Sequence, residues 1–377
     1  MASLQKKLKD NMEKPIGVSG IMRVKNDSEF INTAVESCIS ALDELIIVYN
    51  DCSDNSPDII ETIRQKYPLK IKVYEYIPKI YSVNLTKEEY EKVKNLPPDS
   101  EHLLCNYYNF ALSKVSYRYA LKIDADQFYF TDELKEWCDI YRNSKGRFSF
   151  SVVLGFLIWL YIKVFKLLGN KIGIVLPLFS RKIFHFAYPL YISFVKYCVG
   201  TFSAQVSLSG LNVFYDKEWY ITLGRMNPFI NILPPYNGTG DHLIFKVTKN
   251  TYYVPFDSLE YKNQRSDKYS YIEQFHGDKY PFPIGVFWFH MNAMRDNVKQ
   301  KVKNVKSEHS DYFSKIDRFT KQSYIKDIDG DIPEGLAGTN ERALFNLLHM
   351  MNIDNIKYKY LKYLKPYEKD FSNSSNL

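Results

Sequence analysis

Short apolar stretches alternate with amphipathic segments over the first third of the chain. Buried strands are predicted by the apolar stretches at 16–22, 44–49, 71–76 and 119–123. Between them, apolar residues at helical spacing predict helices over 30–41, from Pro57 to about residue 67, and over about 102–115. Strands that alternate with helices are typical of a parallel sheet covered on both faces, so we expect an α/β fold.

The pattern is less regular in the second half of the chain. Further strands are predicted at 207–214, 219–222, 251–256 and 285–291. A segment rich in Pro, Gly and Asn, 227–240, predicts a long loop. From residue 296 onward the chain becomes polar, and we expect helices that include 341–352 and a tail rich in Tyr and Lys to about residue 369.

Polar segments follow three of the predicted strands, at 23–27, 50–56 and 124–126. Because parallel strands end at one edge of a sheet, and ligands bind beyond their carboxyl ends, these segments are expected to converge on one site.

The last of these segments holds two carboxylates one residue apart, Asp124 and Asp126. Like charges so close repel each other, and each raises the pKa of the other. A divalent cation between them relieves this repulsion, and Mg²⁺ is commonly held by one or two carboxylates together with substrate phosphates. The pair therefore indicates an enzyme that handles a nucleotide diphosphate. The alternative is an ordinary loop or helix start.

Four motifs within residues 16–135 carry a resemblance to a known family. They are Met22-Arg23-Val24-Lys25-Asn26, Tyr49-Asn50-Asp51-Cys52-Ser53-Asp54, Tyr107-Tyr108-Asn109 and Lys122-Ile123-Asp124-Ala125-Asp126. Together they resemble the bacterial β-1,4-N-acetylgalactosaminyltransferases of lipooligosaccharide synthesis and, more broadly, sugar transferases of the GT-A fold. The resemblance implies a Rossmann-like domain that binds a UDP-sugar donor.

The resemblance also implies roles for individual residues. The donor pocket would be lined by Arg23, Lys25, Asn26 and Asp51, with Asn109 either contacting the donor or only stabilising its helix. A Mn²⁺ or Mg²⁺ ion would bridge Asp126, together with Asp124, to the diphosphate. A late His commonly completes such metal sites, which makes His290 the candidate; the alternative is a core histidine packed beside aromatic residues.

Glycosyl transfer also needs a base that accepts the proton of the attacking hydroxyl. Asp241 is our candidate for this catalytic base in an inverting reaction, and the neighbouring His242 would orient it or bind the acceptor. The alternative is that Asp241 caps a short helix that begins at Leu243. Arg295 would neutralise the diphosphate. Arg23 and Lys25 would contact the uridine or phosphates, or else be solvated residues of a surface loop.

The net charge of +7 is unevenly distributed. No Asp or Glu occurs from Ile140 to Tyr215, a stretch that carries nine Lys and Arg residues and two long apolar runs, 148–162 and 183–199. Fifteen uncharged residues are too few to span a bilayer, for which about 20 are needed. Apolar, aromatic and cationic residues without acids are typical of an element at a membrane interface. The alternative is a pair of buried helices whose Lys ends reach solvent.

We therefore expect a basic segment at 1–14, a GT-A domain at 15–310 with a hydrophobic basic insert at 140–203, and a helical extension at 311–377. The scattered cysteines form no CxxC pair, and residues 1–14 lack an apolar signal stretch, so a cytoplasmic protein on the inner membrane face is expected. A nucleic acid partner is not expected, because no base-reading motif is present.

The function that the sequence favours is metal-dependent transfer of a hexose or N-acetylhexosamine from a UDP-sugar to a lipopolysaccharide, lipooligosaccharide or capsule glycan, or to a lipid-linked glycan. Two alternatives remain open at this stage. One is a nucleotidyltransferase of related fold, which would normally carry a Gly-rich phosphate loop after the first strand. The other is a membrane-associated protein that binds sugar nucleotides without catalysis.

Overall fold

The chain forms two compact units, each assembled from separate stretches of sequence. The computed structural model describes residues 14–143, 145–172, 178–222, 236–257, 269–277, 281–319, 356–368 and 371. The first unit comprises Met1–Asn32, Leu42–Ala125 and Ile244–Tyr280, and the second comprises Thr33–Ala41, Asp126–Leu243 and Pro281–Leu377. The chain passes from the first unit to the second within the acidic tripeptide, so Asp124 belongs to one unit and Asp126 to the other.

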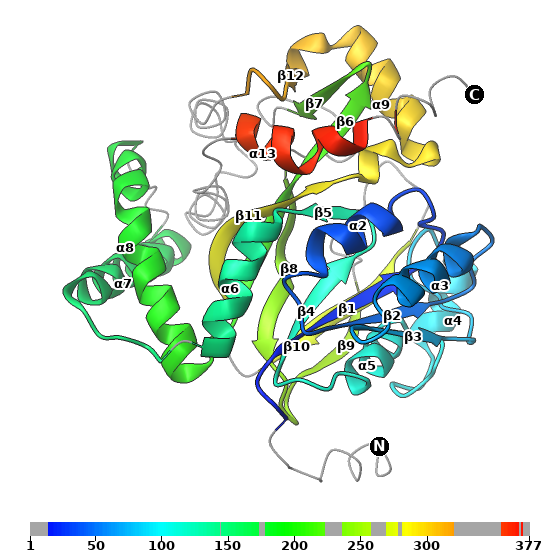
Figure 1. Ribbon diagram of the computed structural model, residues 1–377, viewed down its shortest axis with the longest axis horizontal. Helices are drawn as coiled ribbons and strands as arrows, with labels where there is room; N and C mark the ends of the chain where they lie inside the picture. Colours follow the sequence, from blue (N-terminus) through cyan, green and yellow to red (C-terminus); the bar gives the residue numbers. More distant parts are fainter. Residues whose placement is uncertain are drawn as a thin grey trace. The chain divides into compact units, whose positions relative to one another are not determined.

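A parallel sheet forms the centre of the first unit (Figure 1). Its parallel strands lie in the order β4-β1-β2-β3, with bounds Tyr119–Asp124, Val18–Val24, Glu44–Tyr49 and Ile71–Glu75. The end of β8 (Tyr236–Lys246) pairs antiparallel with β4. Most residues of β1, β2 and β4 are buried on both faces, as expected for parallel strands covered by helices.

The other elements of the first unit are three helices and a hairpin. The helices are α3 (Ser56–Lys66), α4 (Lys87–Lys94) and α5 (Leu104–Ser113), and the hairpin pairs β9 (Tyr252–Asp257) with β10 (Tyr271–His276). Helix α5 is fixed to the sheet by Tyr107, whose hydroxyl donates to the carbonyl of Val48 at 2.6 Å. The sequence pattern did not predict α4 or β10.

A buried carboxylate joins three segments of the first unit. Glu44, at the start of β2, accepts hydrogen bonds from the Ser19 hydroxyl at 2.7 Å, the Lys72 ammonium at 2.6 Å and the Ser116 backbone N–H at 2.5 Å. Burial alone would raise the pKa of Glu44, but these hydrogen bonds outweigh it and lower the pKa below its ordinary value. The carboxylate therefore stays ionised in the core of this unit.

The second unit contains a mixed set of strands. β11 (Phe282–His290) pairs in parallel with β6 (Val206–Asp216) and antiparallel with β5 (Gln127–Tyr129). β6 continues through a tight turn into β7 (Glu218–Thr222), which pairs with β12 (Phe313–Lys315). Besides the two helices of the insert, the described helices of this unit are α6 (Thr131–Asn143), α9 (Asp296–Glu308), α13 (Ile356–Tyr363) and the short 3₁₀ turns η2 (Asn292–Met294), η3 (Ser310–Tyr312) and η4 (Lys365–Tyr367). Helix α2 (Ile31–Cys38) begins in the first unit and ends in the second.

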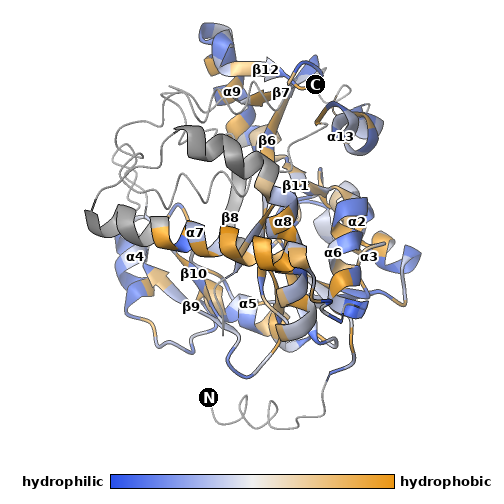
Figure 2. Cartoon of the chain, turned by 90° about the vertical axis from the view of Figure 1, so that its left-hand side faces the viewer, coloured by the Kyte–Doolittle hydropathy of each residue, from blue (hydrophilic) through white to orange (hydrophobic). Residues whose placement is uncertain are grey.

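The hydrophobic basic insert forms two long helices, α7 (Phe150–Ile172) and α8 (Leu178–Phe202). Figure 2 shows α7 as the most continuously hydrophobic helix of that view. The two helices approach closely at Gly155, where a Cβ atom would lie 2.1 Å from the Leu190 carbonyl oxygen, so this position requires glycine. No described helix is long and apolar enough to cross a membrane.

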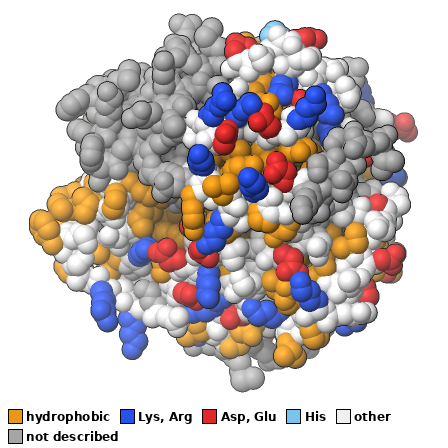
Figure 3. All heavy atoms as spheres, turned by 45° about the horizontal axis from the view of Figure 1, so that its top comes forward, with side chains coloured by type: hydrophobic (Ala, Val, Ile, Leu, Met, Phe, Trp, Pro, Cys, Tyr) orange, Lys and Arg blue, Asp and Glu red, His pale blue; other side chains and the backbone are white. Residues whose placement is uncertain are grey.

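The insert packs against β11 of the same unit. The hydroxyls of Tyr188 and Tyr191 donate to the Ile284 and Pro283 carbonyls at 2.7 and 3.1 Å. Helix α7 exposes a row of large apolar side chains: Phe156, Leu157, Leu160 and Val164. Hydrophobic side chains gather on the left-hand side of Figure 3, where α7 and α8 lie in Figure 1.

Two predictions about the second half are wrong. The loop expected over 227–240 ends earlier, because β8 begins at Tyr236. Asp241 does not cap a helix, because the apolar residues Leu243, Ile244 and Phe245 continue β8. The remainder of that loop, 223–235, and the helix expected over 341–352 lie outside the described residues.

Candidate active site

The carboxyl ends of β1 and β4 bring Arg23 and Asp124 side by side in the first unit. Arg23 is the register partner of Asp124 across the parallel strand pair. Paired residues of parallel strands point to the same face, and both side chains are partly exposed. The first unit thus presents a cation and a carboxylate together at the strand ends, where the sequence predicts donor binding.

Aromatic side chains fix the position of Arg23. Its guanidinium carbon lies 3.6 Å from the Tyr108 ring centre, its Nη2 donates to the Tyr108 hydroxyl, and its Nε is buried without a hydrogen-bond partner among the described residues. The Tyr108 ring also stacks on Tyr253 at 4.6 Å. Stacking of a planar guanidinium on an aromatic face restricts its orientation. Arg23 is therefore held in place, unlike a solvated loop residue.

A second cation lies against the same tyrosine. The Lys122 ammonium lies 5.0 Å from the Tyr108 ring centre and 3.4 Å from a carboxylate oxygen of Glu273 in β10. Burial alone would lower the pKa of Arg23, but nearby Tyr108, Glu273 and Asp124 raise it. Two cations and two carboxylates balance each other here, which is the condition for keeping charges in a partly buried place.

The loops after β1 and β2 hold each other through side chains. Lys25 Nζ lies 2.8 Å from Asp51 Oδ2, and Asn26 exchanges hydrogen bonds with Ser53 through both ends of its amide. Asn26 and Asp51 have φ of 58° and 48°, the left-handed region that Asn and Asp tolerate better than most residues. The structure thus brings together Lys25, Asn26 and Asp51, as predicted for one pocket wall.

Cys52 lies in the second of these loops, between Asp51 and Ser53, and is partly exposed. Its thiol faces the backbone carbonyls of Val24 and Asn50 at 3.9 Å. Burial raises the pKa of the Cys52 thiol, and nearby carboxylates add to this effect.

Asn109 has a different position from the other predicted donor residues. Its amide nitrogen donates to the Tyr253 carbonyl at 2.9 Å, and its amide oxygen accepts from the Tyr253 N–H at 2.8 Å. This paired contact fixes α5 to β9. It therefore corresponds to the second role predicted for Asn109, stabilisation of its helix.

Asp126 forms the centre of a buried cluster in the second unit. One of its carboxylate oxygens accepts from Arg295 Nη2 at 2.9 Å and from Nε at 3.1 Å. The other lies 3.4 Å from Nε2 of His290. The Asp126 backbone carbonyl also accepts from the Met291 N–H at 2.9 Å, which fixes the segment after β11 beside the tripeptide. Three residues predicted separately, Asp126, His290 and Arg295, therefore meet.

Asn212 determines which nitrogen of His290 faces Asp126. Nδ1 of His290 lies 2.6 Å from the amide oxygen of Asn212, which can only accept a hydrogen bond. Nδ1 therefore carries a proton, which leaves Nε2, on the side of the carboxylate, as the ring nitrogen that could bind a metal. A histidine held in this way is the usual arrangement of a metal ligand with its supporting partner.

The spacing of these atoms fits two ligands of one divalent ion. Cis ligands of an octahedral ion lie about 3 Å apart, and Nε2 of His290 and Oδ1 of Asp126 are 3.4 Å apart. Among the described residues no group of three His, Cys, Asp or Glu side chains is placed to enclose a metal by itself. The structure therefore brings together two of the three predicted ligands, Asp126 and His290. The third, Asp124, is the register partner of Arg23 in the first unit.

Asp241 and His242 are the two residues predicted to act on the acceptor, and the structure describes the side chain of His242 alone. The backbone of Asp241 lies in β8, and its side chain is outside the described residues. His242 is buried, 2.7 Å from the Gln127 amide nitrogen and with its ring centre 4.9 Å from that of Trp288. This is the environment of a packed core histidine.

One family model matches the N-terminal part of the chain. Residues 3–177 match the family model described as beta-1,4-N-acetylgalactosaminyltransferase (CgtA). This part of the chain is therefore similar to a family of glycosyltransferases. The match confirms the resemblance carried by the four motifs, all of which lie within it. No curated protein matches the chain.

Solved structures give weaker likenesses. TarS 1–349 of S. aureus in complex with UDP is 19% identical, with a TM-score of 0.22, over 33% of this chain and 31% of that chain. Glucosyl-3-phosphoglycerate synthase of Mycobacterium tuberculosis with Mn²⁺, UDP-glucose and phosphoglyceric acid is 14% identical, with a TM-score of 0.19, over 33% and 38%. The chain thus spans about a third of the length of these proteins. TM-scores this low carry no argument about the site.

Sequence reasoning missed several residues of these clusters. Glu273 on β10 contacts Lys122 of β4, and Tyr253 on β9 contacts Tyr108 of α5; no local pattern marks either as a partner of these distant residues. Asn212 lies within an apolar strand, where a single buried amide was the available signal.

Proposed function

We propose that the glycosyltransferase uses a UDP-sugar, with hexose or N-acetylhexosamine of the Gal or GalNAc type as the transferred group. The acceptor would be a lipopolysaccharide, lipooligosaccharide or capsule glycan. The observation that carries this proposal is the pairing of Arg23 with Asp124 at the ends of adjacent parallel strands, within the family match. A cation and a carboxylate at such an edge suit a nucleotide diphosphate and its counter-ion.

The residues at the strand ends would bind the donor and a metal ion. The fixed guanidinium of Arg23 contacts the diphosphate or uridine, and the loops around Lys25 and Asp51 form a wall of the nucleotide pocket. Asp124 and Asp126, together with His290, would hold Mn²⁺ or Mg²⁺. Such an ion supplies Lewis-acid stabilisation of charge on the departing diphosphate.

Arg295 is proposed to exchange partners. It hydrogen-bonds Asp126 in this structure and neutralises that carboxylate. When Asp126 serves as a ligand, the guanidinium becomes available to the diphosphate, a group that Arg binds in bidentate fashion. Asn212 keeps the proton on Nδ1 of His290, so that Nε2 remains a lone-pair donor.

Asp241 is proposed as the base of an inverting reaction. A carboxylate within reach of the acceptor hydroxyl would take its proton during attack on the anomeric carbon. Replacement of Asp241 by Asn should reduce transfer to acceptor much more than binding of donor, because the amide cannot take up the proton.

We further propose that the protein acts at the inner face of the cytoplasmic membrane through α7 and α8. Two observations support this attachment: the absence of acidic residues over 140–215 and the exposed apolar face of α7. Interfacial helices combine these two properties. The packing of α8 against β11 agrees in part with the alternative of buried helices.

The test is product release from a panel of UDP-sugars with Mn²⁺, Mg²⁺ or EDTA. Release of UDP from one donor, stimulated by metal, is the expected result. Pyrophosphate release instead would indicate a nucleotidyltransferase, and binding of UDP without turnover of any donor would indicate a non-catalytic protein.

A further inference from the structure

A polar cavity lies where the two helices of the insert meet their connections. Its volume is about 480 Å³, within the range of small-ligand pockets. It is lined by Asn143, Lys145, Gly146, Arg147, Ser149, Ser151, Val152, Ser193, Lys196 and Tyr197. All of these lining residues belong to the second unit, and none is acidic. The glycosyl-transfer proposal uses none of them.

The basic residues of this cavity are anchored by the backbone between them. A Cβ atom on Gly146 would lie 2.0 Å from the Thr201 hydroxyl and 2.8 Å from the Tyr197 carbonyl oxygen, so this connection is pressed against the end of α8. Lys145 and Arg147 flank that point of contact. Among the described residues no carboxylate forms an ion pair with Lys145 or Arg147, whereas Lys196 pairs with Glu136 at 2.6 Å.

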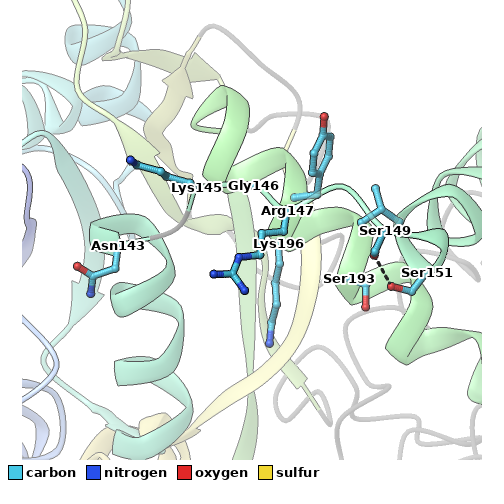
Figure 4. Close-up of a pocket in the computed structure, with 10 residues that line it drawn as sticks. Asn143, Lys145, Gly146, Arg147, Ser149, Ser151, Ser193 and Lys196 are labelled. Carbon is cyan, nitrogen blue, oxygen red and sulfur yellow. Dashed lines mark hydrogen bonds between the residues drawn. The ribbon is translucent and has the colours of Figure 1, made fainter.

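Hydroxyl groups line another part of the cavity. Figure 4 shows Arg147 and Lys196 to one side and Ser149, Ser151 and Ser193 to the other. The Ser149 and Ser151 hydroxyls are 2.8 Å apart and hydrogen-bonded to each other. Guanidinium, ammonium and hydroxyl groups together are the donors that proteins use for phosphate oxygens.

Aromatic side chains border the same cavity. Phe148 and Phe202 are mostly exposed, and each ring contacts Tyr197, at 5.9 and 6.1 Å between ring centres. Phe150, the first residue of α7, is also mostly exposed. Exposed aromatic rings next to a cationic cavity match the two parts of a phospholipid, its acyl chains and its phosphate.

We propose that this cavity binds the phosphate of an anionic phospholipid, with Lys145 and Arg147 as the charged contacts and Ser149 and Ser151 as hydrogen-bond donors. The inference rests on the membrane attachment proposed above and names its ligand. Lipid binding here would attach the insert to the bilayer at a defined point, because the phosphate is held while Phe148, Phe150 and Phe202 enter the interface.

The first experiment measures binding of the full chain to vesicles by flotation. Vesicles of phosphatidylcholine are compared with vesicles that also contain phosphatidylglycerol, and with vesicles given equal surface charge by a carboxylate amphiphile. We expect binding to follow phosphatidylglycerol. Equal binding to the carboxylate vesicles would overturn the phosphate site in favour of general surface charge.

Matched variants locate the binding. Lys145→Gln with Arg147→Gln should weaken binding to phosphatidylglycerol vesicles about 30-fold, the loss expected when two cations near an anionic surface are removed. The control, Lys299→Gln with Lys303→Gln in α9, removes the same charge elsewhere. Equal losses in both variants would overturn the proposal.

A neutral variant separates hydrogen bonding from charge. Ser149→Ala with Ser151→Ala should weaken binding to phosphatidylglycerol several-fold and leave the weak binding to phosphatidylcholine unchanged. If binding to phosphatidylglycerol were unchanged, the Ser149 and Ser151 hydroxyls would not be part of the site. UDP release in detergent-free solution, measured on every variant, should stay at the unaltered level, so failure of the lipid site is distinguishable from failure of the transferase proposal.

Discussion

The guanidinium of Arg295 donates two hydrogen bonds to one carboxylate oxygen of Asp126, at 2.9 and 3.1 Å, while His290 lies 3.4 Å from the other oxygen. Asp126 is almost fully buried. A buried carboxylate needs partners of this kind, because an unpaired charge in such a place is strongly unfavourable. The same carboxylate is the residue on which the proposed chemistry most depends.

Replacement of Asp126 by Asn should lower kcat for metal-stimulated UDP release at least about 100-fold, because several kcal/mol of transition-state stabilisation depend on the ion. The neutral amide is a poor metal ligand and leaves Arg295 without its charge partner. Circular dichroism and thermal unfolding would verify that the variant folds. Full activity in a folded variant would reject the proposed role of this residue.

His290→Ala should raise the concentration of Mn²⁺ needed for half-maximal activity about 10- to 100-fold. Asn212→Ala, which leaves the ring in place but frees Nδ1, should have a smaller effect in the same direction. Metal titration of both variants against the unaltered protein gives the comparison. If His290→Ala showed an unchanged metal requirement, His290 would be the core histidine of the alternative hypothesis.

Arg23→Lys should raise KM for the UDP-sugar, because Lys keeps the charge but cannot reproduce the planar contact with Tyr108. We expect a change of about tenfold, the size of one charge-assisted hydrogen bond. Tyr108→Phe is the matched control: it removes the hydroxyl and keeps the ring, so its effect should be smaller. Identical kinetics in Arg23→Lys would show that the guanidinium does not contact the donor.

Glu44→Gln tests the buried carboxylate of the first unit. The pKa of Glu44 is lowered in the folded protein, so its ionised form contributes stability at pH values above the unfolded pKa, about 4.3. That contribution is lost as pH falls through the folded pKa. The variant should be about 3 kcal/mol less stable at neutral pH.

Urea unfolding at several pH values would measure this difference. The gap between Glu44→Gln and the unaltered protein should narrow as pH falls below about 4.3. A gap that stayed constant with pH would mean that the loss arises from shape and packing and not from the charge.

Leu157→Glu should release the protein from membranes without unfolding it. Leu157 is 52% exposed on α7, so the substitution adds a charge to the outward face and removes few internal contacts. The same change at Leu361 in α13, which is 46% exposed, is the matched control. Membrane fractionation that found both variants equally bound would exclude α7 as the attachment face.

The first unit is largely predictable from sequence because its structural signals are local. The strands around Met22, Ile47 and Ile123 are continuous apolar runs between polar loops, and their observed bounds differ from the predicted ones by a few residues. Convergence of the loop residues at the strand ends then follows from the parallel arrangement.

The second unit is less predictable because its contacts join distant parts of the chain. The His290–Asn212 pair of the second unit joins residues 78 positions apart, and the Lys122–Glu273 pair, which the sequence also did not reveal, spans 151 positions within the first unit. Strand β8 begins with Tyr236-Asn237-Gly238-Thr239-Gly240, a composition that favours a loop, so its start does not follow from local preference. Asp126, His290 and Arg295 could be named individually, but their hydrogen bonds could not be assigned from spacing alone.

The partial exposure of Cys52 has a practical consequence. The other four cysteines, Cys38, Cys105, Cys138 and Cys198, are buried. A thiol-reactive fluorophore should therefore label one position, next to Asp51, and label it faster at alkaline pH because the pKa of the thiol is raised. A fluorophore on Cys52 would thus report occupancy of the proposed nucleotide pocket without any engineering of the sequence.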